Sequence, residues 1–134
     1  MYFMIYKKPL FWEIVTLSVI VALLHKAALS FYLYYTISWF DIVMHFLGGG
    51  LIGLIILFSL YIYEWEPFHK NHKINVFIVA VGGVLIVGLV WELWELFVGF
   101  TDIVKDGPDT LLDIIMDLLG ASMAFMYAKK YLWQ

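Results

Sequence analysis

The sequence contains no cysteine and no arginine, and charge of either sign is scarce. Without cysteine the chain can form neither a disulfide nor a thiolate metal site. Cysteine usage therefore does not indicate whether its compartment is oxidising or reducing. The eight basic residues are all lysine, which binds phosphate as a point charge without the bidentate geometry of a guanidinium. A formal net charge of -3 without a basic stripe argues against nucleic acid as a partner.

Apolar residues dominate what is present. They make up 64% of the 134 residues and charged residues 14%, against about half and about a quarter in soluble globular proteins. Four segments approach the roughly 20 apolar residues that a bilayer requires. These segments cover approximately residues 10–30, 40–63, 74–100 and 109–132. The sequence therefore predicts an all-α polytopic membrane protein whose single domain, residues 1–134, is a compact bundle of four transmembrane helices.

The lysines predict the orientation of this bundle. If the four helices cross alternately, three pairs fall on one side: Lys7 and Lys8, Lys70 and Lys73, and Lys129 and Lys130. Lysine-rich loops favour the cytoplasm, so both termini are expected there, in a multi-pass protein of the cell's inner (cytoplasmic) membrane. The opposite side has Lys26 and Lys105 and is mainly acidic.

Carboxylates and one imidazole recur inside three predicted helices at spacings of three or four residues, which place them on one helix face. They are Asp41 and His45, then Glu92 and Glu95 in "WELWEL", then Asp109, Asp113 and Asp117. Each group lies near the outer end of its helix, so all are expected in one layer. Asp41 and Asp109 also suit helix starts, whereas the two glutamates lie well inside a helix.

Small residues share these acidic stripes, which predicts that the stripes face one another rather than lipid. The predicted stripes are Asp41, His45 and Gly48; Gly88, Glu92, Glu95 and Gly99; Asp113, Asp117, Gly120 and Ala124; and Ser18, Ala22 and His25. A separate pair, Gly49 and Gly53, favours packing inside the protomer over a dimer seam.

Burial of so many acids needs compensation, since an ionised carboxylate at the bilayer centre costs about 2.5 to 3.5 kcal/mol or more. A divalent cation, protonation, or pairing with His25 and Lys26 would each supply it, and only a cation explains why the acids converge. Carboxylates with imidazole favour Mn, Fe or Zn, with Mg or Ca also acceptable. The predicted ligands are Asp41, His45, Glu92, Glu95, Asp109, Asp113 and Asp117.

Three short segments, "FDIVMHFLGGGLIG", "WELWELFVG" and "DGPDTLLDIIMDLLGAS", resemble the YjdF-like family of small bacterial inner-membrane proteins. They are more distantly similar to VanZ-like membrane proteins, which are associated with resistance to glycopeptide antibiotics at the cell envelope. The resemblance covers roughly residues 40 to 122. It implies a polar core formed by Asp41, His45, Glu92, Glu95, Asp109, Thr110 and Asp113. The basic residue that VanZ-like proteins often carry ahead of the last helix has only Lys105 as a counterpart here.

The sequence leaves three functions open. In the first, a metal-dependent enzyme hydrolyses or transfers a lipid or lipid-linked envelope substrate, with His45 and Asp113 as catalytic groups. The headgroup would then contact His25, Lys26, Trp91 and Trp94, although both tryptophans also suit an interfacial belt. In the second, the acids bind or transport cations or protons, and transport would need a homo-oligomer because four helices are few for alternating access. The third is a small scaffold with a structural metal.

Overall fold

The fold is a bundle of helices in a computed structural model that describes residues 8–63, 72–99 and 107–133. Four helices are long and apolar enough to cross a membrane, and the described residues contain no strand. The helices are α1 (Pro9–Phe31), α2 (Leu33–Thr36), α3 (Phe40–Ile62), α5 (Lys73–Val98) and α6 (Gly107–Leu132). The all-α, four-span prediction is thereby confirmed, and the predicted boundaries lie within two residues of the observed ones.

Local sequence explains where these helices start and stop. Pro9 occupies the first turn of α1, where its missing N–H costs no helical hydrogen bond. Gly99 ends α5 in the left-handed conformation, with φ of 78°, and its N–H donates to the carbonyls of Glu95 and Leu96. Tyr32 also adopts a left-handed φ, 57°, and this turn separates α1 from the short α2, which the sequence did not predict.

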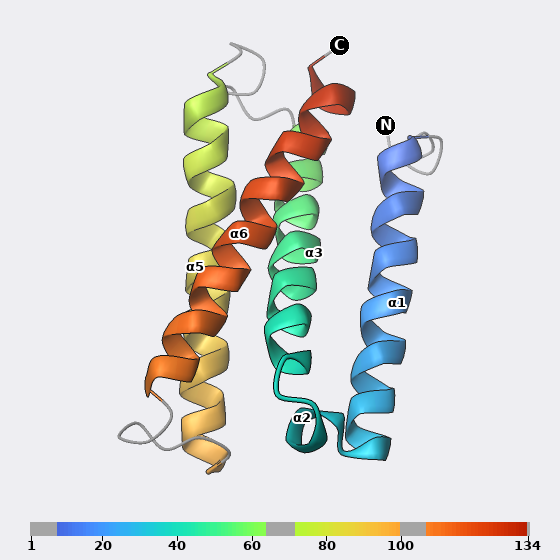
Figure 1. The fold of residues 1–134 in the computed structure, drawn as a ribbon. Helices are drawn as coiled ribbons and strands as arrows, with labels where there is room; N and C mark the ends of the chain where they lie inside the picture. The colour runs from blue at the N-terminus through green and yellow to red at the C-terminus, as the bar shows by residue number, and fades with distance from the viewer. Residues whose placement is uncertain (1–7, 64–71, 100–106, 134) are drawn as a thin grey trace.

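Helix α3 is central, because it contacts α1, α5 and α6. Figure 1 shows α1 and α5 on opposite sides of α3, with α6 crossing α3 and α5 at a slant. The start of α1 and the end of α6 lie at the same end of the bundle. Lys8, Lys73, Lys129 and Lys130 therefore share this end, as predicted, and we call it the lysine end. Lys7, Lys70 and Lys105 lie outside the described residues.

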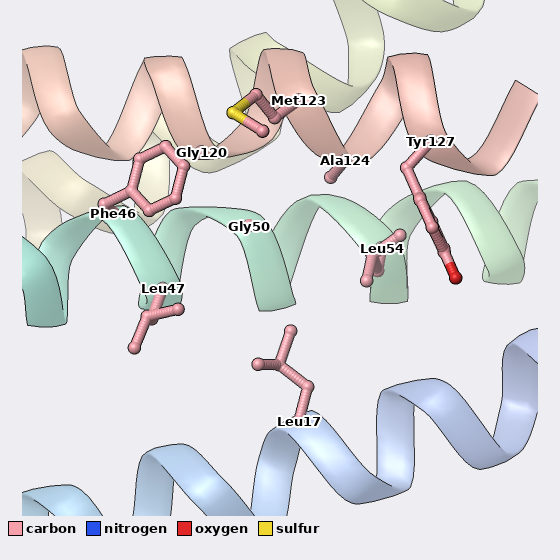
Figure 2. A pocket seen from close by; sticks show the side chains of 9 residues that line it. All are labelled: Leu17, Phe46, Leu47, Gly50, Leu54, Gly120, Met123, Ala124 and Tyr127. Carbon is pink, nitrogen blue, oxygen red and sulfur yellow. The ribbon is translucent and has the colours of Figure 1, made fainter.

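The seam between α3 and α6 is closed at the level of the backbone. A Cβ added to Gly120 would overlap the Phe46 carbonyl oxygen and lie 2.7 Å from the Gly50 nitrogen. A Cβ on Gly49 would overlap the backbone of Asp117, and one on Gly53 would lie 3.1 Å from the Ala121 Cα. Figure 2 shows Gly50 and Gly120 where the two ribbons approach. Gly49 and Gly53 thus pack inside the protomer, as the sequence predicted.

Three small residues do not lie where the predicted stripes put them. A Cβ at Gly48 would meet nothing within 4 Å, because Gly49 is the residue that faces α6. Gly99 caps α5 and likewise faces open space. Ala22 is exposed, whereas Ala28 is fully buried in the contact between α1 and α3. Residues three and four apart both fit one helix face, so spacing alone selected the wrong neighbour.

Helix α1 packs against the bundle through partly buried residues along its length, and its fully buried residues lie near its two ends. Near its start, Leu10 is 2% exposed and belongs to a core cluster with Leu57 and Leu132. Near its end, Ala28 packs with Phe40 and Met44. The middle of α1 therefore lies against α3 much less closely than α6 does.

Candidate metal centre

Three side chains from α3 and α6 converge at the end of the bundle opposite the lysine end. Asp41 and His45 lie in the first two turns of α3, and Asp113 lies in the second turn of α6. Each of the three offers a ligand atom, and these atoms all lie within 4.8 Å of one another. Because the glycines of the α3–α6 seam fix the register of the two helices, the backbone holds this group together.

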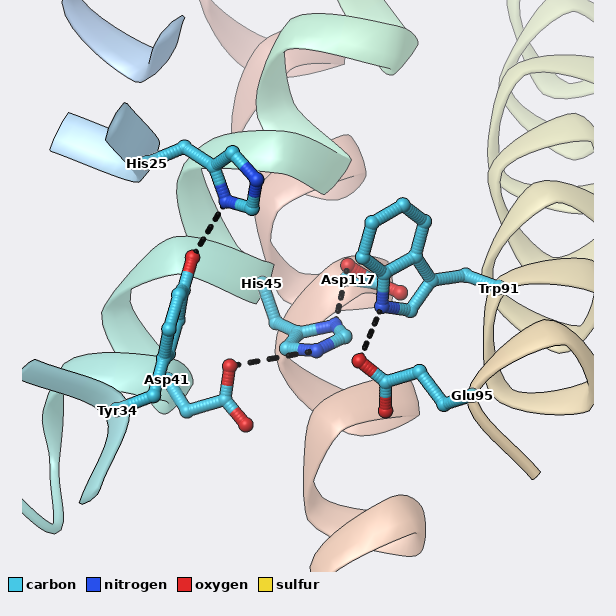
Figure 3. A network of polar contacts seen from close by, with 7 residues as sticks. All are labelled: His25, Tyr34, Asp41, His45, Trp91, Glu95 and Asp117. Carbon is cyan, nitrogen blue, oxygen red and sulfur yellow. Dashed lines mark hydrogen bonds and ion pairs between the residues drawn. The ribbon is translucent and has the colours of Figure 1, made fainter. Parts of the chain in front are cut away.

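His45 lies between two carboxylates. Its Nε2 is 3.8 Å from Asp41 Oδ1 and its Nδ1 is 3.4 Å from Asp117 Oδ1, as Figure 3 shows. The His45 side chain is 10% exposed, against 39% for that of Asp41. One nitrogen of a neutral imidazole can bind a cation while the other donates its proton to a carboxylate, which orients the ring. Asp117 is placed for this orienting contact.

Asp117 occupies space that α5 leaves free. A Cβ added to Gly88 would lie 2.6 Å from Asp117 Oδ2, so only glycine leaves room for the carboxylate there. Asp117 is 7% exposed. The small residue at position 88 therefore holds an acid inside the bundle, in addition to the role in helix approach that the sequence predicted.

Two buried carboxylates near this group carry oxygens without a partner. Asp113 is 4% exposed and Glu92 is 8% exposed. Asp113 Oδ1 and Glu92 Oε1 have no hydrogen-bond partner in the part of the chain that the structure describes. Thr110 interacts with the Glu92 carboxylate, and Glu92 also interacts electrostatically with His45 and Asp113. A buried acceptor without a donor or a cation costs free energy, so these two oxygens require an explanation.

The other predicted ligands lie at the rim of this layer. Glu95 is partly buried, and its Oε1 accepts a hydrogen bond of 2.9 Å from Trp91 Nε1. Trp94 stacks obliquely on Trp91 with ring centroids 5.1 Å apart, and both indoles are exposed. Asp109 is exposed in the first turn of α6, where an acid stabilises the helix dipole.

His25 contacts a residue that sequence reasoning missed. Its Nδ1 lies 2.8 Å from the hydroxyl of Tyr34, in α2, and Figure 3 shows this pair beside Asp41. Burial, followed by the charges of Asp41 and Glu95, raises the pKa of Tyr34 to about 12. Lys26 is exposed on α1. The run "FYLYYTISWF" signalled an interfacial connector, but no spacing rule singled out one of its tyrosines.

The donor set suits a small divalent cation. Ligands about 2.1 Å from a metal lie about 3 to 4 Å from one another, so the three groups need to close by about 1 Å to share one ion. Two carboxylates and one imidazole match Mn, Fe or Zn, and the orphaned oxygens of Asp113 and Glu92 add acceptors. A cation bound here could activate water or polarise a phosphoryl or ester oxygen.

Comparison with known proteins identifies a family. A family model described as "Predicted membrane protein (DUF2238)" matches residues 1–134. No curated protein and no solved structure matches the chain.

Proposed function

Since the chain belongs to this family of membrane proteins, we propose that it is an integral membrane protein that binds a divalent cation through Asp41, His45 and Asp113. One observation carries the proposal: Asp113 Oδ1 and Glu92 Oε1 are buried and find no hydrogen-bond partner among residues 8–63, 72–99 and 107–133, although an imidazole and a second carboxylate lie nearby. A bound cation would satisfy those oxygens and offset the repulsion between the acids.

The side chains around the proposed cation have different roles. Asp113 and His45 bind the cation from opposite sides of the α3–α6 seam, and Asp41, the most exposed of the three, closes the site. Glu92 approaches from α5 as a further ligand or as a proton acceptor. Asp117 orients His45 through its Nδ1 contact. The favoured ions are Mn, Fe and Zn, because an imidazole ligand suits them better than Mg or Ca.

The finer proposal is a chemical role for that cation. A bound cation would polarise the ester or phosphoryl group of a lipid or lipid-linked envelope substrate and activate water for hydrolysis of that bond. His45 and Asp113 would hold the cation, and Glu92 would accept the proton of the water. Trp91 and Trp94 are exposed beside the layer, where a headgroup in the membrane plane would pass. A metal-dependent product from bacterial lipid extracts, lost in Asp113→Asn, is the expected result, and an unchanged lipid profile would contradict it.

Orientation is proposed from the lysines. With the lysine end in the cytoplasm, the cation site lies in the outer half of the inner membrane. Because the chain has no cysteine, single cysteines at positions 26 and 129 report the two sides. A membrane-impermeant thiol reagent added outside spheroplasts is expected to label Lys26→Cys and not Lys129→Cys, and the reverse pattern would overturn this orientation.

The resemblance to YjdF-like and VanZ-like proteins supports this proposal through its residues. The positions that it implies include Asp41, His45 and Asp113, which the structure brings together. We therefore extend the proposal to a function of this protein at the cell envelope.

The test of cation binding is thermal stabilisation of the purified protein. Manganese, zinc, magnesium and calcium are added separately to protein stripped with chelator, and unfolding is followed with each. Saturation at about 100 times the dissociation constant is expected to add about 2.7 kcal/mol to the free energy of unfolding. The increase should vanish in Asp113→Asn and persist in Asp109→Asn, the exposed aspartate one turn earlier in α6. Equal increases in the two variants, or none in the unaltered protein, would overturn the proposal.

A further inference from the structure

An apolar groove runs along the middle of α1, on the side of the bundle away from α5. It has a cavity volume of about 200 Å³. Its floor is the α3–α6 seam at Gly50 and Gly120, and its sides are formed by Leu17, Leu54 and Met123. Figure 2 shows Leu17 pointing from α1 toward this floor. The groove lies where α1 packs through partly buried residues such as Leu17, between the fully buried Leu10 and Ala28 near its two ends.

Hydrocarbon fits this groove better than water. An apolar cavity of about 150 Å³ stays dry and takes up a molecule such as benzene, so this larger apolar space also disfavours water. The groove lies near mid-height on helices that can span a membrane, where the surrounding solvent is lipid acyl chain. One acyl chain lying between α1 and the α3–α6 seam would add van der Waals contacts to those that Leu17 already makes with the core.

The lysine end of the groove has the chemistry of a lipid headgroup region. Tyr127 lines the groove, and its hydroxyl lies 3.3 Å from that of Tyr131. Tyr131 in turn donates to Glu13 Oε1 at 2.9 Å. The ammonium of Lys130 lies 3.9 Å from the centre of the Tyr127 ring. A polar cluster of tyrosine hydroxyls with an ammonium about one helical turn away suits the headgroup level of a phospholipid, where Lys130 would meet the phosphate.

A second hollow adjoins the groove on α1. It has a volume of about 320 Å³ and is lined by Trp12, Glu13, Thr16, Leu17 and Ile20. The two hollows share Leu17, so they flank one side chain. This arrangement leaves room for both chains of a diacyl lipid, one on each side of Leu17. Among the described residues that line or adjoin the two hollows, Glu13 is the acid, and Lys8 and Lys130 are two basic residues at the same end.

We propose that a phospholipid of the leaflet at the lysine end binds here, with one acyl chain on the floor formed by Gly50 and Gly120 and its phosphate at Lys130. This site is separate from the cation centre and does not depend on the proposed function. It defines α1 as the wall of a lipid site.

The test is photo-crosslinking with a phosphatidylglycerol that carries a diazirine in the middle of one acyl chain. The full-length protein is reconstituted into vesicles of phosphatidylglycerol and phosphatidylcholine, and the labelled residues are mapped by mass spectrometry. Adducts are expected at Leu47 and Leu54, which line the groove and are not exposed, above those at the lipid-exposed Leu23 and Ile86.

Filling the groove should remove those adducts. Leu17→Trp is expected to lower them about tenfold, as a loss of about 1.4 kcal/mol of binding would, while Val19→Trp, on the exposed side of α1, leaves them unchanged. Met123→Phe fills the same space from α6, should α1 fail to dock in the first variant. Melting temperatures of all three variants verify that they fold.

The headgroup contact has its own matched pair. Lys130→Gln is expected to lower groove labelling about fivefold, since one lysine near the membrane surface contributes about 1 kcal/mol, and Lys129→Gln serves as the control. Groove adducts no more frequent than those at Leu23 and Ile86, or equal in the two tryptophan variants of α1, would overturn the proposal. Groove residues that stay unlabelled while Leu23 and Ile86 are labelled would do so too, because the groove would then be filled by a second copy or by another segment of the chain.

Discussion

Helices α6 and α1 both pack on α3, but in opposite ways. Along α6, glycine and alanine bring the two backbones into contact, so that a single added Cβ at Gly120 or Gly49 would overlap the other helix. Along α1, the fully buried residues are Leu10 and Ala28 near its ends, and between them partly buried side chains border an apolar groove. The α3–α6 seam has no side chain that could adjust at its closest point. The contact between α1 and α3 leaves space between the helices.

This difference explains where the polar residues lie. Asp41, His45, Asp113 and Asp117 are all on the two helices of the closed seam, whose register the backbone fixes. A cation site needs ligands held within a fraction of an ångström, and backbone contact provides that precision. Helix α1 supplies only His25, through Tyr34, at the margin of the layer. The α3–α6 seam therefore fixes the positions of the candidate ligands. The contact between α1 and α3 only borders the candidate site.

The largest expected effect comes from adding a methyl group where the backbones of α3 and α6 touch. Gly120→Ala should destabilise the protein by more than about 3 kcal/mol, because the new methyl would overlap the Phe46 carbonyl and backbone cannot rotate away. Unfolding in mild detergent measures the loss. Gly48→Ala is the control, since a Cβ there meets nothing within 4 Å and a stability change within about 1 kcal/mol is expected. Similar losses in both variants would mean that the seam is not closed as described.

A smaller effect is expected where α5 meets the site. Gly88→Ala should displace the Asp117 carboxylate from His45, since its Cβ would lie 2.6 Å from Asp117 Oδ2. A flexible side chain can move, so the fold should survive, while cation affinity falls about 10- to 100-fold, as for other contacts that orient a ligand. Cation titration of the purified variant measures this change. The control is Gly82→Ala on the same helix, where a Cβ would meet no described atom within 4 Å, and it should bind the cation as the unaltered protein does. Equal cation affinities for Gly88→Ala and Gly82→Ala would contradict the orienting role assigned to Asp117.

The smallest effect is expected at the margin, between α1 and α2. Tyr34→Phe removes the hydroxyl that contacts His25 and should cost about 1 kcal/mol of stability. The pKa of Tyr34 is raised to about 12 in the folded protein, against about 10 in an unfolded chain. The stability difference between the unaltered protein and this variant should therefore be constant below pH 10. It should shrink as the pH rises toward 12, because the unfolded chain then loses the proton first. Denaturant unfolding at several pH values measures the difference, and one that grows above pH 10 would contradict this assignment.

The sequence predicted the helices and the polar layer because both depend on patterns along one helix. Segment length and apolar content located all four spans, and three- and four-residue spacing brought Asp41, His45 and Asp113 to one layer. Which small residue faces a neighbour depends on the rotation of each helix about its axis, which spacing does not determine. Gly48 was therefore predicted to share the face of Asp41 and His45 that meets the other helices, whereas Gly49, predicted separately as a packing residue, is the one that faces α6. The Tyr34 contact and the groove depend on how α1 docks, which no periodicity describes.

The measurement that tests the central claim most directly is the metal content of protein purified without added chelator or metal. Elemental analysis of the unaltered chain and of Asp109→Asn is expected to give one divalent cation per protomer. Asp113→Asn and His45→Ala, each of which removes a member of the three-residue group, are expected to give none. A cation-free unaltered protein, or a content that is the same in all four proteins, would contradict the account.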